Sequence, residues 1–308
     1  MHGQISNGGY RFAWRTLAGL ALALPGGVLL AQQMSGARAP AQDKAVLAML
    51  AKQYGSPSAV IAGIDLAAPF QTRSPWRLVV VQELPHPDRS QDDSDAFRAV
   101  SICFVKGKVP DCSEQVVRSE FKARAVDLDA APPDTGTRPF YNLLDSRLVY
   151  RGTDRTRPLL RLKTCDWRRM DDGCDRASFL FDYDRAADRF RQVFFGLEGT
   201  NNNQETRFIE NGPLRGDVVA VYPTPNAPYT YFVDVYRPDT VGRYVSTLHF
   251  RGHTGYGDHN SLAVIDSEMP EILGRLGDWK RGDALPPPAK MPQDCRRLML
   301  RDGVEWCD

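Results

Sequence analysis

Residues 178–195 read SFLFDYDRAADRFRQVFF, and this stretch decides the fold. Its first part alternates, so that Phe179, Phe181 and Tyr183 fall on one face of an extended strand. A second run of apolar residues, 189–195, follows directly after the short polar segment RAAD. Two such runs separated by a few turn-forming residues predict an antiparallel β-hairpin.

Similar short runs lie on both sides of this hairpin. Upstream they are residues 60–64, 76–84 and 97–106, and downstream 206–210, 217–222, 229–236 and 244–250. The segments between them are rich in Gly, Pro, Asn and Asp, which favour turns. We therefore expect a mainly β protein with an antiparallel β-propeller-like or β-sandwich architecture. No sequence signature recurs from unit to unit, so both alternatives stay open.

Two short helices complete this prediction. Residues 43–54 carry apolar side chains at helical spacing, with Asp43 as the N-cap and Gly55 as the stop. Residues 270–276 predict a second helix that ends at Gly277. Patterns long enough to form the crossover helices of a parallel sheet are missing.

The N-terminus has the features of a secretory signal. Arg11 and Arg15 precede the apolar run 16–30, and Ala31 offers a small residue for cleavage. We expect a signal peptide at 1–31, a flexible spacer at 32–42 and a periplasmic or secreted protein without a membrane span after cleavage. The alternative is an uncleaved anchor, although the run is short for a membrane-spanning helix.

The six cysteines form three pairs that are close in sequence: Cys103/Cys112, Cys165/Cys174 and Cys295/Cys307. Their spacing is wider than that of zinc ligands, and no C-x-x-C redox motif is present. In an exported protein such pairs predict three local disulfides. The expected domains are an antiparallel β domain with its leading helix at 43–281 and a Pro-rich, disulfide-closed tail at 282–308.

The charge of the chain argues against nucleic-acid binding. It has 39 Lys and Arg against 38 Asp and Glu, a formal net charge of +1. Proteins that bind nucleic acid through phosphate contacts need a clear excess of basic residues. We therefore expect no nucleic-acid partner.

A glycine-rich segment, residues 249–260, holds the best candidate residues. His249, His253 and His259 with Asp258 suggest a metal or catalytic site, whereas the glycines favour an exposed recognition loop. We prefer the loop interpretation and predict a contact surface of His253, Tyr256, Asp258 and His259. The turn 222–229 is a second candidate, and the tyrosines of this region otherwise serve as strand-forming residues.

Other constellations carry weaker signals. Asp182, Asp184 and Asp188 offer oxygen ligands for calcium, but the calcium-loop pattern needs more of them. Ser119 and Lys122 match S-x-x-K without its companion motifs. Since no catalytic motif is complete, we predict no catalytic residue, no metal and no cofactor.

These observations predict a non-enzymatic binding or inhibitory protein of the cell envelope, with an envelope protein or a glycan as its ligand. The alternative is a hydrolase of envelope polysaccharide or peptidoglycan that uses paired carboxylates such as Asp266 or Glu268. Glu268 and Glu271 also suit the start of the 270–276 helix, which is a purely structural role. A structural component of the envelope is a third possibility.

Overall fold

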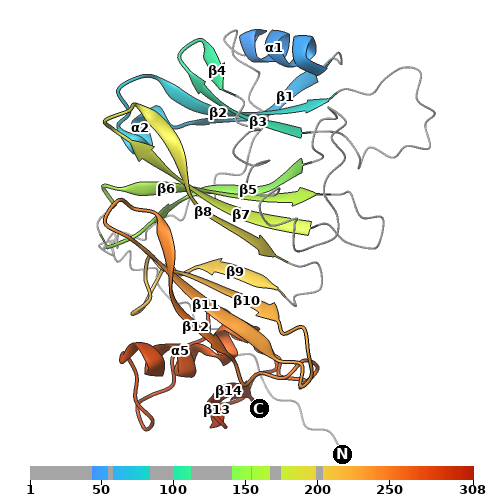
Figure 1. Cartoon of the computed structure of the whole chain (residues 1–308), viewed down its shortest axis with the longest axis vertical. Helices are drawn as coiled ribbons and strands as arrows, with labels where there is room; N and C mark the ends of the chain where they lie inside the picture. The colour runs from blue at the N-terminus through green and yellow to red at the C-terminus, as the bar shows by residue number, and fades with distance from the viewer. Residues whose placement is uncertain are drawn as a thin grey trace, which may run out of the picture. The chain divides into compact units, whose positions relative to one another are not determined.

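The described part of the computed structural model is built around three four-stranded antiparallel sheets (Figure 1). The structure describes residues 44–54, 58–83, 100–111, 141–153, 155–166, 175–198 and 204–308. All of them belong to the unit Gly36–Asp308. The predicted signal peptide, the spacer and the S-x-x-K motif lie outside the described residues.

Each sheet is a meander in which strands adjacent in sequence pair with one another. Sheet A contains β1 (Ser58–Asp65), β2 (Trp76–Glu83), β3 (Val100–Lys106) and β4 (Val109–Asp111). Sheet B contains β5 (Tyr141–Tyr150), β6 (Pro158–Asp166), β7 (Asp175–Asp184) and β8 (Arg189–Glu198). Sheet C contains β9 (Glu205–Phe208), β10 (Val218–Pro223), β11 (Tyr231–Pro238) and β12 (Tyr244–Arg251).

Short helices and a last hairpin complete the described chain. The helices are α1 (Lys44–Tyr54), α2 (Ala67–Phe70), α4 (Val264–Ser267) and α5 (Met269–Leu276). The strands β13 (Leu298–Arg301) and β14 (Val304–Cys307) pair with each other as the C-terminal hairpin. None of the helices among the described residues has the length and hydropathy needed to cross a membrane.

The alternation in β7 positions the main cores. Phe179, Phe181 and Tyr183 face sheet A, where they pack with Trp76 and Phe104. Leu180 points to the opposite face and packs on residues of sheet C. The hairpin prediction is therefore confirmed, and sheet B buries both of its faces. Burial of each such side chain stabilises the fold by about 1.5–3 kcal/mol relative to leaving it exposed to water.

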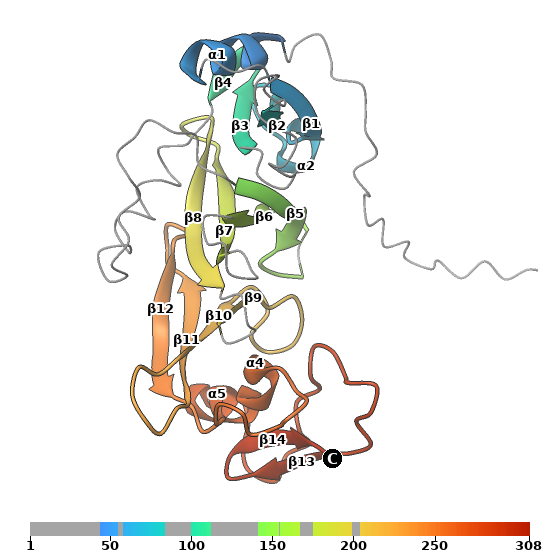
Figure 2. The ribbon, with the colours of Figure 1, turned by 90° about the vertical axis from the view of Figure 1, so that its right-hand side faces the viewer.

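Sheets A and C also bury both of their faces, because helices cover their outer faces (Figure 2). Sheet A packs its other face on α1 through Val46 and Leu50. Sheet C packs its other face on α4 and α5 through Ile265 and Ile272. The apolar cores thus link helix, sheet A, sheet B, sheet C and helix pair in chain order. A mainly β, antiparallel fold is confirmed, and the choice between propeller and sandwich stays a prediction.

Several boundaries differ from the sequence-based expectation. Strands β5 and β6 were not predicted, because apolar residues lie on both of their faces and the alternation is weak. The predicted run 229–236 begins at Tyr229, but β11 begins only at Tyr231. Tyr231, Val233 and Val235 are buried on one face of β11, whereas Tyr229 is 60% exposed. The C-terminal tail contains a hairpin rather than a simple closed loop.

One of the three predicted disulfides is directly described. Cys295 and Cys307 are bonded, with their Cα atoms 5.3 Å apart. Cys103 is also disulfide-bonded, and its predicted partner Cys112 lies outside the described residues. Cys174, the predicted partner of Cys165, also lies outside the described residues. The pairings Cys103/Cys112 and Cys165/Cys174 therefore stay predictions.

Candidate functional site

The loop between β12 and α4 carries all four residues predicted as a contact surface. We call residues 252–260 the histidine loop. Its side chains His253, Tyr256 and His259 are exposed, and Asp258 is half-buried. Gly257 and His259 have φ values of 77° and 65°, in the left-handed region that permits such a tight path. The glycine-rich sequence thus forms a compact turn that presents polar and aromatic side chains.

The turn between β10 and β11 lies beside this loop. Its exposed residues are 225–229, and they are held by bonds across the base of the turn. Thr224 N–H donates to the Thr230 carbonyl at 2.9 Å, and Thr230 N–H donates to Thr224 Oγ1 at 3.1 Å. Tyr229 is therefore exposed on a turn whose ends are fixed.

Backbone hydrogen bonds join the two loops. Tyr256 N–H donates to the Tyr229 carbonyl at 2.9 Å, and Gly252 N–H donates to the Tyr231 carbonyl at 2.7 Å. Arg251 Nε–H donates to Thr230 Oγ1 at 2.9 Å, and its Nη2 donates to the carbonyl of the residue before Tyr229. The residues Arg251, Tyr229 and Tyr256, whose side chains are exposed, are thereby held on adjoining stretches of backbone, and we call them the tyrosine surface.

The structure brings together only part of the predicted histidine cluster. His249 lies on β12, where its Nδ1 is 2.9 Å from Asp234 Oδ1 and its ring stacks on Phe232. His253 and His259 belong to the histidine loop instead. No group of three or more His, Cys, Asp or Glu residues in the described part of the chain has the arrangement of a metal site. Arg251 was missed by the sequence analysis, although it directly follows the alternating strand.

Asp258 and Tyr256 flank a buried tyrosine at the base of the loop. Asp258 Oδ1 accepts the Asn260 N–H at 2.9 Å, which closes the end of the loop. Burial raises the pKa of the Tyr231 hydroxyl, and the nearby Tyr256 and Asp258 raise that pKa further. The hydroxyl of Tyr231 is therefore neutral, and it lies near Tyr256 of the tyrosine surface.

The three aspartates considered for calcium have separate partners. Asp182 pairs with Arg151, and Asp184 accepts two backbone N–H groups of its own turn. Asp188 binds Lys106 Nζ at 2.7 Å. Each carboxylate is therefore engaged in a contact within the protein, which explains the aspartates without an ion.

The carboxylates considered for catalysis are also engaged in internal contacts. Asp266 is 3% exposed and accepts bonds from Arg207 at 2.5 Å and from the Ala289 N–H at 3.0 Å. Glu268 is 0% exposed, and its Oε1 accepts the Thr254 N–H at 2.5 Å. Glu271 pairs with Arg275 along α5. Asp266 and Glu268 are thus interior residues that fix the helices and the histidine loop.

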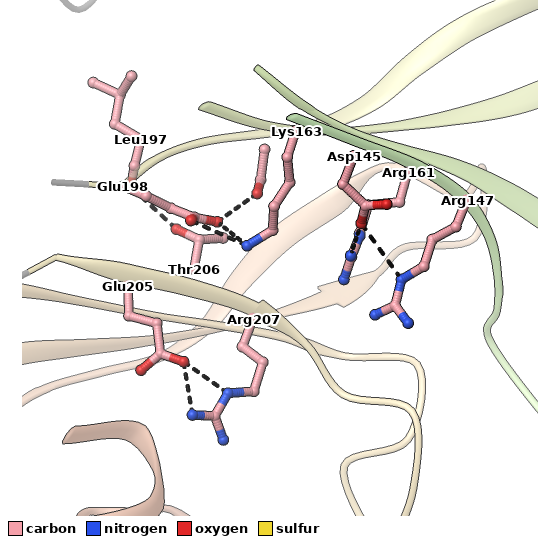
Figure 3. A network of polar contacts seen from close by, with 10 residues as sticks. Asp145, Arg147, Arg161, Lys163, Leu197, Glu198, Glu205, Thr206 and Arg207 are labelled. Atoms are coloured by element: carbon pink, nitrogen blue, oxygen red, sulfur yellow. Dashed lines mark hydrogen bonds and ion pairs between the residues drawn. The ribbon is translucent and has the colours of Figure 1, made fainter. Parts of the chain in front are cut away.

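A polar seam between sheets B and C is shown in Figure 3. Lys163 Nζ lies 2.8 Å from Glu198 Oε1, which also accepts the Ser178 hydroxyl at 2.6 Å. Arg161 pairs with Asp145, so each cation has an acid beside it. Arg161, Lys163, Ser178 and Thr206 line a small cavity with room for about one water molecule. The seam is therefore a neutralised contact between sheets.

A second group of charges extends this seam towards α4. Arg207 bonds to both Glu205 and Asp266, with Nε 2.8 Å from Glu205 Oε1. Burial raises the pKa of Glu205, and the Arg207 guanidinium opposes that shift. One arginine thus binds carboxyl groups from β9 and from α4, which ties sheet C to the C-terminal helices.

The C-terminal hairpin places a different kind of acid beside the histidine loop. Glu305 is 0% exposed, and both of its carboxyl oxygens have no hydrogen-bond partner among the described residues. Burial raises the pKa of Glu305 to about 7, and the nearby Asp266 contributes to the same shift. Sequence reasoning missed this residue, because nothing in the local pattern of β14 signals that it is buried.

The chain has no recognisable relative in the comparisons with known proteins. No protein-family model matches it, no curated protein matches it, and no solved structure matches it.

Proposed function

We propose that the protein is a non-enzymatic binding protein of the cell envelope, and that its tyrosine surface binds an acidic glycan. The single observation that carries this proposal is the hydrogen bond from Tyr256 N–H to the Tyr229 carbonyl at 2.9 Å. It fixes two tyrosines from different loops next to each other, with their side chains 60% and 57% exposed. Aromatic rings that are exposed on fixed loops offer a contact area that is already ordered before a partner binds.

The chemistry of the surface favours a sugar ligand. Tyrosine rings pack on the apolar faces of sugar rings, and their hydroxyls exchange hydrogen bonds with sugar hydroxyls. Arg251 adds a positive charge, and the recorded partners of its guanidinium are neutral oxygens. An arginine held in this way offers its remaining N–H groups to a carboxylate. A glycan with uronic acid residues therefore fits better than a neutral one.

The compartment follows the same proposal. The Cys295–Cys307 bond requires an oxidising environment, and the leader-like N-terminus predicts export. We infer a periplasmic or secreted protein, in contact with envelope polysaccharide. Antiparallel sheets that pack face to face form the layers of a β-sandwich, and helices cover the outer faces of sheets A and C. We therefore propose a sandwich-like rather than a propeller-like architecture for this scaffold.

The hydrolase alternative has less support. Glycoside cleavage needs an acid and a second carboxylate on either side of an accessible glycosidic bond. Asp266 is bound to Arg207 and Glu268 to a backbone N–H, and both are almost completely buried. Release of reducing ends from envelope polysaccharide, lost in Asp266→Asn, would favour the enzyme.

A calorimetric titration tests the proposal. The exported protein is titrated with oligogalacturonate and, as a matched neutral probe, with its methyl ester. We expect binding of the acid that weakens with added salt. Tyr229→Ala and Tyr256→Ala should each weaken binding about tenfold, and Arg251→Gln should abolish the preference for the acid.

Arg243→Gln is the matched control. Arg243 is exposed and precedes the other end of β12, so its loss should leave binding unchanged. If the wild type bound the acid and the methyl ester equally well, as Arg251→Gln is expected to do, the acidic ligand would be contradicted. Specific retention of an envelope protein in place of either sugar would contradict the glycan and favour a protein partner.

A further inference from the structure

The C-terminal hairpin docks through the first two residues of its second strand. Val304 is 3% exposed and Glu305 is 0% exposed, whereas Arg301 and Asp302 are exposed. The Cys295–Cys307 bond and paired backbone contacts between Arg297 and Asp308 close the hairpin at its base. The hairpin is thus a stiff unit, and its docking buries one apolar residue and one carboxyl group.

Asn260 connects this hairpin to the histidine loop. Its Nδ2 donates to the Glu305 carbonyl at 2.8 Å and to Ser267 Oγ at 3.0 Å. Its Oδ1 accepts the Cys307 N–H at 3.4 Å and the Leu262 N–H at 3.1 Å. Asn260 is the last residue of the loop that carries Tyr256, so undocking of the hairpin removes bonds that fix the loop.

The turn of the hairpin also lies close to the start of the loop. A Cβ on Gly303 would lie 3.8 Å from His253 Cδ2 and 3.7 Å from Glu271 Oε2. His253 therefore rests beside the hairpin turn. The histidine loop is supported by the hairpin at both its beginning and its end.

The neutral form of the carboxyl group at this interface favours docking, and the ionised form opposes it. An ionised carboxylate that is buried without hydrogen-bond donors loses its hydration and gains nothing in return. The carboxylate of Asp266 lies near Glu305 and opposes a second negative charge. When the hairpin undocks, Glu305 meets water and can ionise without this penalty.

Charged and titratable groups lie on every element that packs on β14. From α4 there is Asp266, whose charge is offset by Arg207; from α5 there is the Glu271–Arg275 pair. Between the two helices lies the buried Glu268, whose Oε1 accepts the Thr254 N–H. From the loop there are His253 and Asp258, and from β13 there is Arg301, which stacks on the Trp306 ring. None of these cations makes a recorded contact with the Glu305 carboxyl in the described residues.

We propose that the C-terminal hairpin is a pH-dependent clamp on the ligand-binding loop, docked while Glu305 is protonated and released when Glu305 ionises. The effect of the clamp on ligand binding rests on the proposed function, because the clamped loop carries Tyr256 of the tyrosine surface. It assigns a regulatory role to a residue of the tail. Ligand binding is then strongest in acidic surroundings.

The direction of the effect follows from the linkage between protonation and docking. The pKa of Glu305 is raised from 4.5 to about 7 in the docked state. The protonation of Glu305 therefore contributes its full free energy to docking below about pH 4.5, and this contribution is lost as the pH rises to about 7. Within that window the docking equilibrium changes up to about tenfold for each pH unit.

Amide hydrogen exchange on the full chain tests the clamp without any ligand. Protection factors, corrected for the intrinsic exchange rate, are compared at about pH 5 and about pH 8. We expect the protection of β14 and of Asn260 to fall on the order of a hundredfold, while β7 and β11 keep theirs. Glu305→Gln and the apolar, similarly sized Glu305→Met should both remove this pH dependence.

Glu271→Gln is the matched control, since it changes a neighbouring acid that has its own partner, and it should keep the pH dependence. Protection of β14 that is equal at both pH values in the wild type would overturn the clamp. Protection that still falls with pH in Glu305→Met would also overturn it. Because no sugar is present, this result is separate from the titration, whose failure would instead overturn the proposed function.

Discussion

The indole of Trp76 on β2 donates a hydrogen bond of 2.9 Å to Asp188 Oδ1, although the two residues are 112 positions apart in the sequence. Asp188 also accepts the Ser74 hydroxyl at 2.6 Å and the Tyr183 hydroxyl at 2.6 Å. Lys106 Nζ lies 2.7 Å from its other oxygen. One carboxylate at the start of β8 therefore fastens sheet A to sheet B at the edge of their shared aromatic core.

The first prediction concerns the charge of Asp188. Asp188→Asn removes the ion pair with Lys106 and one acceptor oxygen, so it should lower the urea midpoint of unfolding. Lys106 first, then the hydroxyls of Ser74 and Tyr183, hold the pKa of Asp188 well below its usual range. The stabilisation is present above about pH 3.8 and is lost as the pH falls further. The difference between variant and wild type should therefore shrink in acid.

The exposed Asp294 provides the control, because Asp294→Asn removes a carboxylate of the same type outside this contact. It should leave the urea midpoint unchanged at every pH. A midpoint of Asp188→Asn equal to that of the wild type at neutral pH would show that Asp188 does not fasten the sheets.

The second prediction concerns the ring that completes this contact between sheets. Phe190 on β8 lies with its centroid 4.9 Å from Phe70, 5.6 Å from Trp76 and 5.2 Å from Phe104. Phe190→Ala removes contacts with three residues of sheet A and α2, and should cost about 3 kcal/mol of unfolding free energy. Chemical denaturation measures this loss. Leu144→Ala, at a site that is 48% exposed, should cost far less.

Local patterns predicted several of the strands and two of the helices, but not which elements pack on one another. The alternation of Phe179, Phe181 and Tyr183 predicted β7 and its buried face, because period-two burial depends only on neighbours in sequence. The apolar spacing of residues 270–276 likewise predicted α5. The position of Asp188 beside Trp76 depends on the packing of two sheets, which no local period encodes. A calcium ligand was therefore considered where the structure has an ion pair with Lys106.

The same reasoning applies to the candidate site. The glycine-rich segment predicted an exposed loop with His253, Tyr256 and His259, and the loop is present. Arg251 could not be assigned to it, because its role depends on the turn before β11 lying alongside. Glu305 could not be identified as buried, since β14 is too short to show an alternation and its cover comes from α4 and α5.

The third prediction concerns the space at the start of the histidine loop. A Cβ on Gly252 would lie 2.6 Å from Glu268 Oε1, the oxygen that accepts the Thr254 N–H. Glu268 is completely buried and held by this bond, so it cannot move away cheaply. Gly252→Ala should therefore destabilise the protein by about 1–3 kcal/mol, measured by urea unfolding.

Gly274 in α5 is the matched control, because a Cβ there meets its nearest neighbour, the Trp279 carbonyl, at an ordinary 3.8 Å. Gly274→Ala should raise the unfolding free energy by up to about 1 kcal/mol, as alanine favours the helix. If Gly252→Ala behaved like Gly274→Ala, the tight contact with Glu268 would be refuted.

The last prediction concerns the Cys295–Cys307 bond. The bond joins cysteines 12 positions apart, and loop closure of this length is worth about 3 kcal/mol through the unfolded chain. Cys295→Ser with Cys307→Ser should lower the unfolding free energy of the C-terminal hairpin by about that amount. Hydrogen exchange should show the loss as lower protection of β13 and β14, the strands that the bond closes into a hairpin. The bond from Asn260 to the Glu305 carbonyl then remains as a polar link between β14 and the loop. Sheet B, whose apolar faces pack on sheets A and C, should keep its protection, and equal loss in β7 would show that the bond stabilises the whole chain instead.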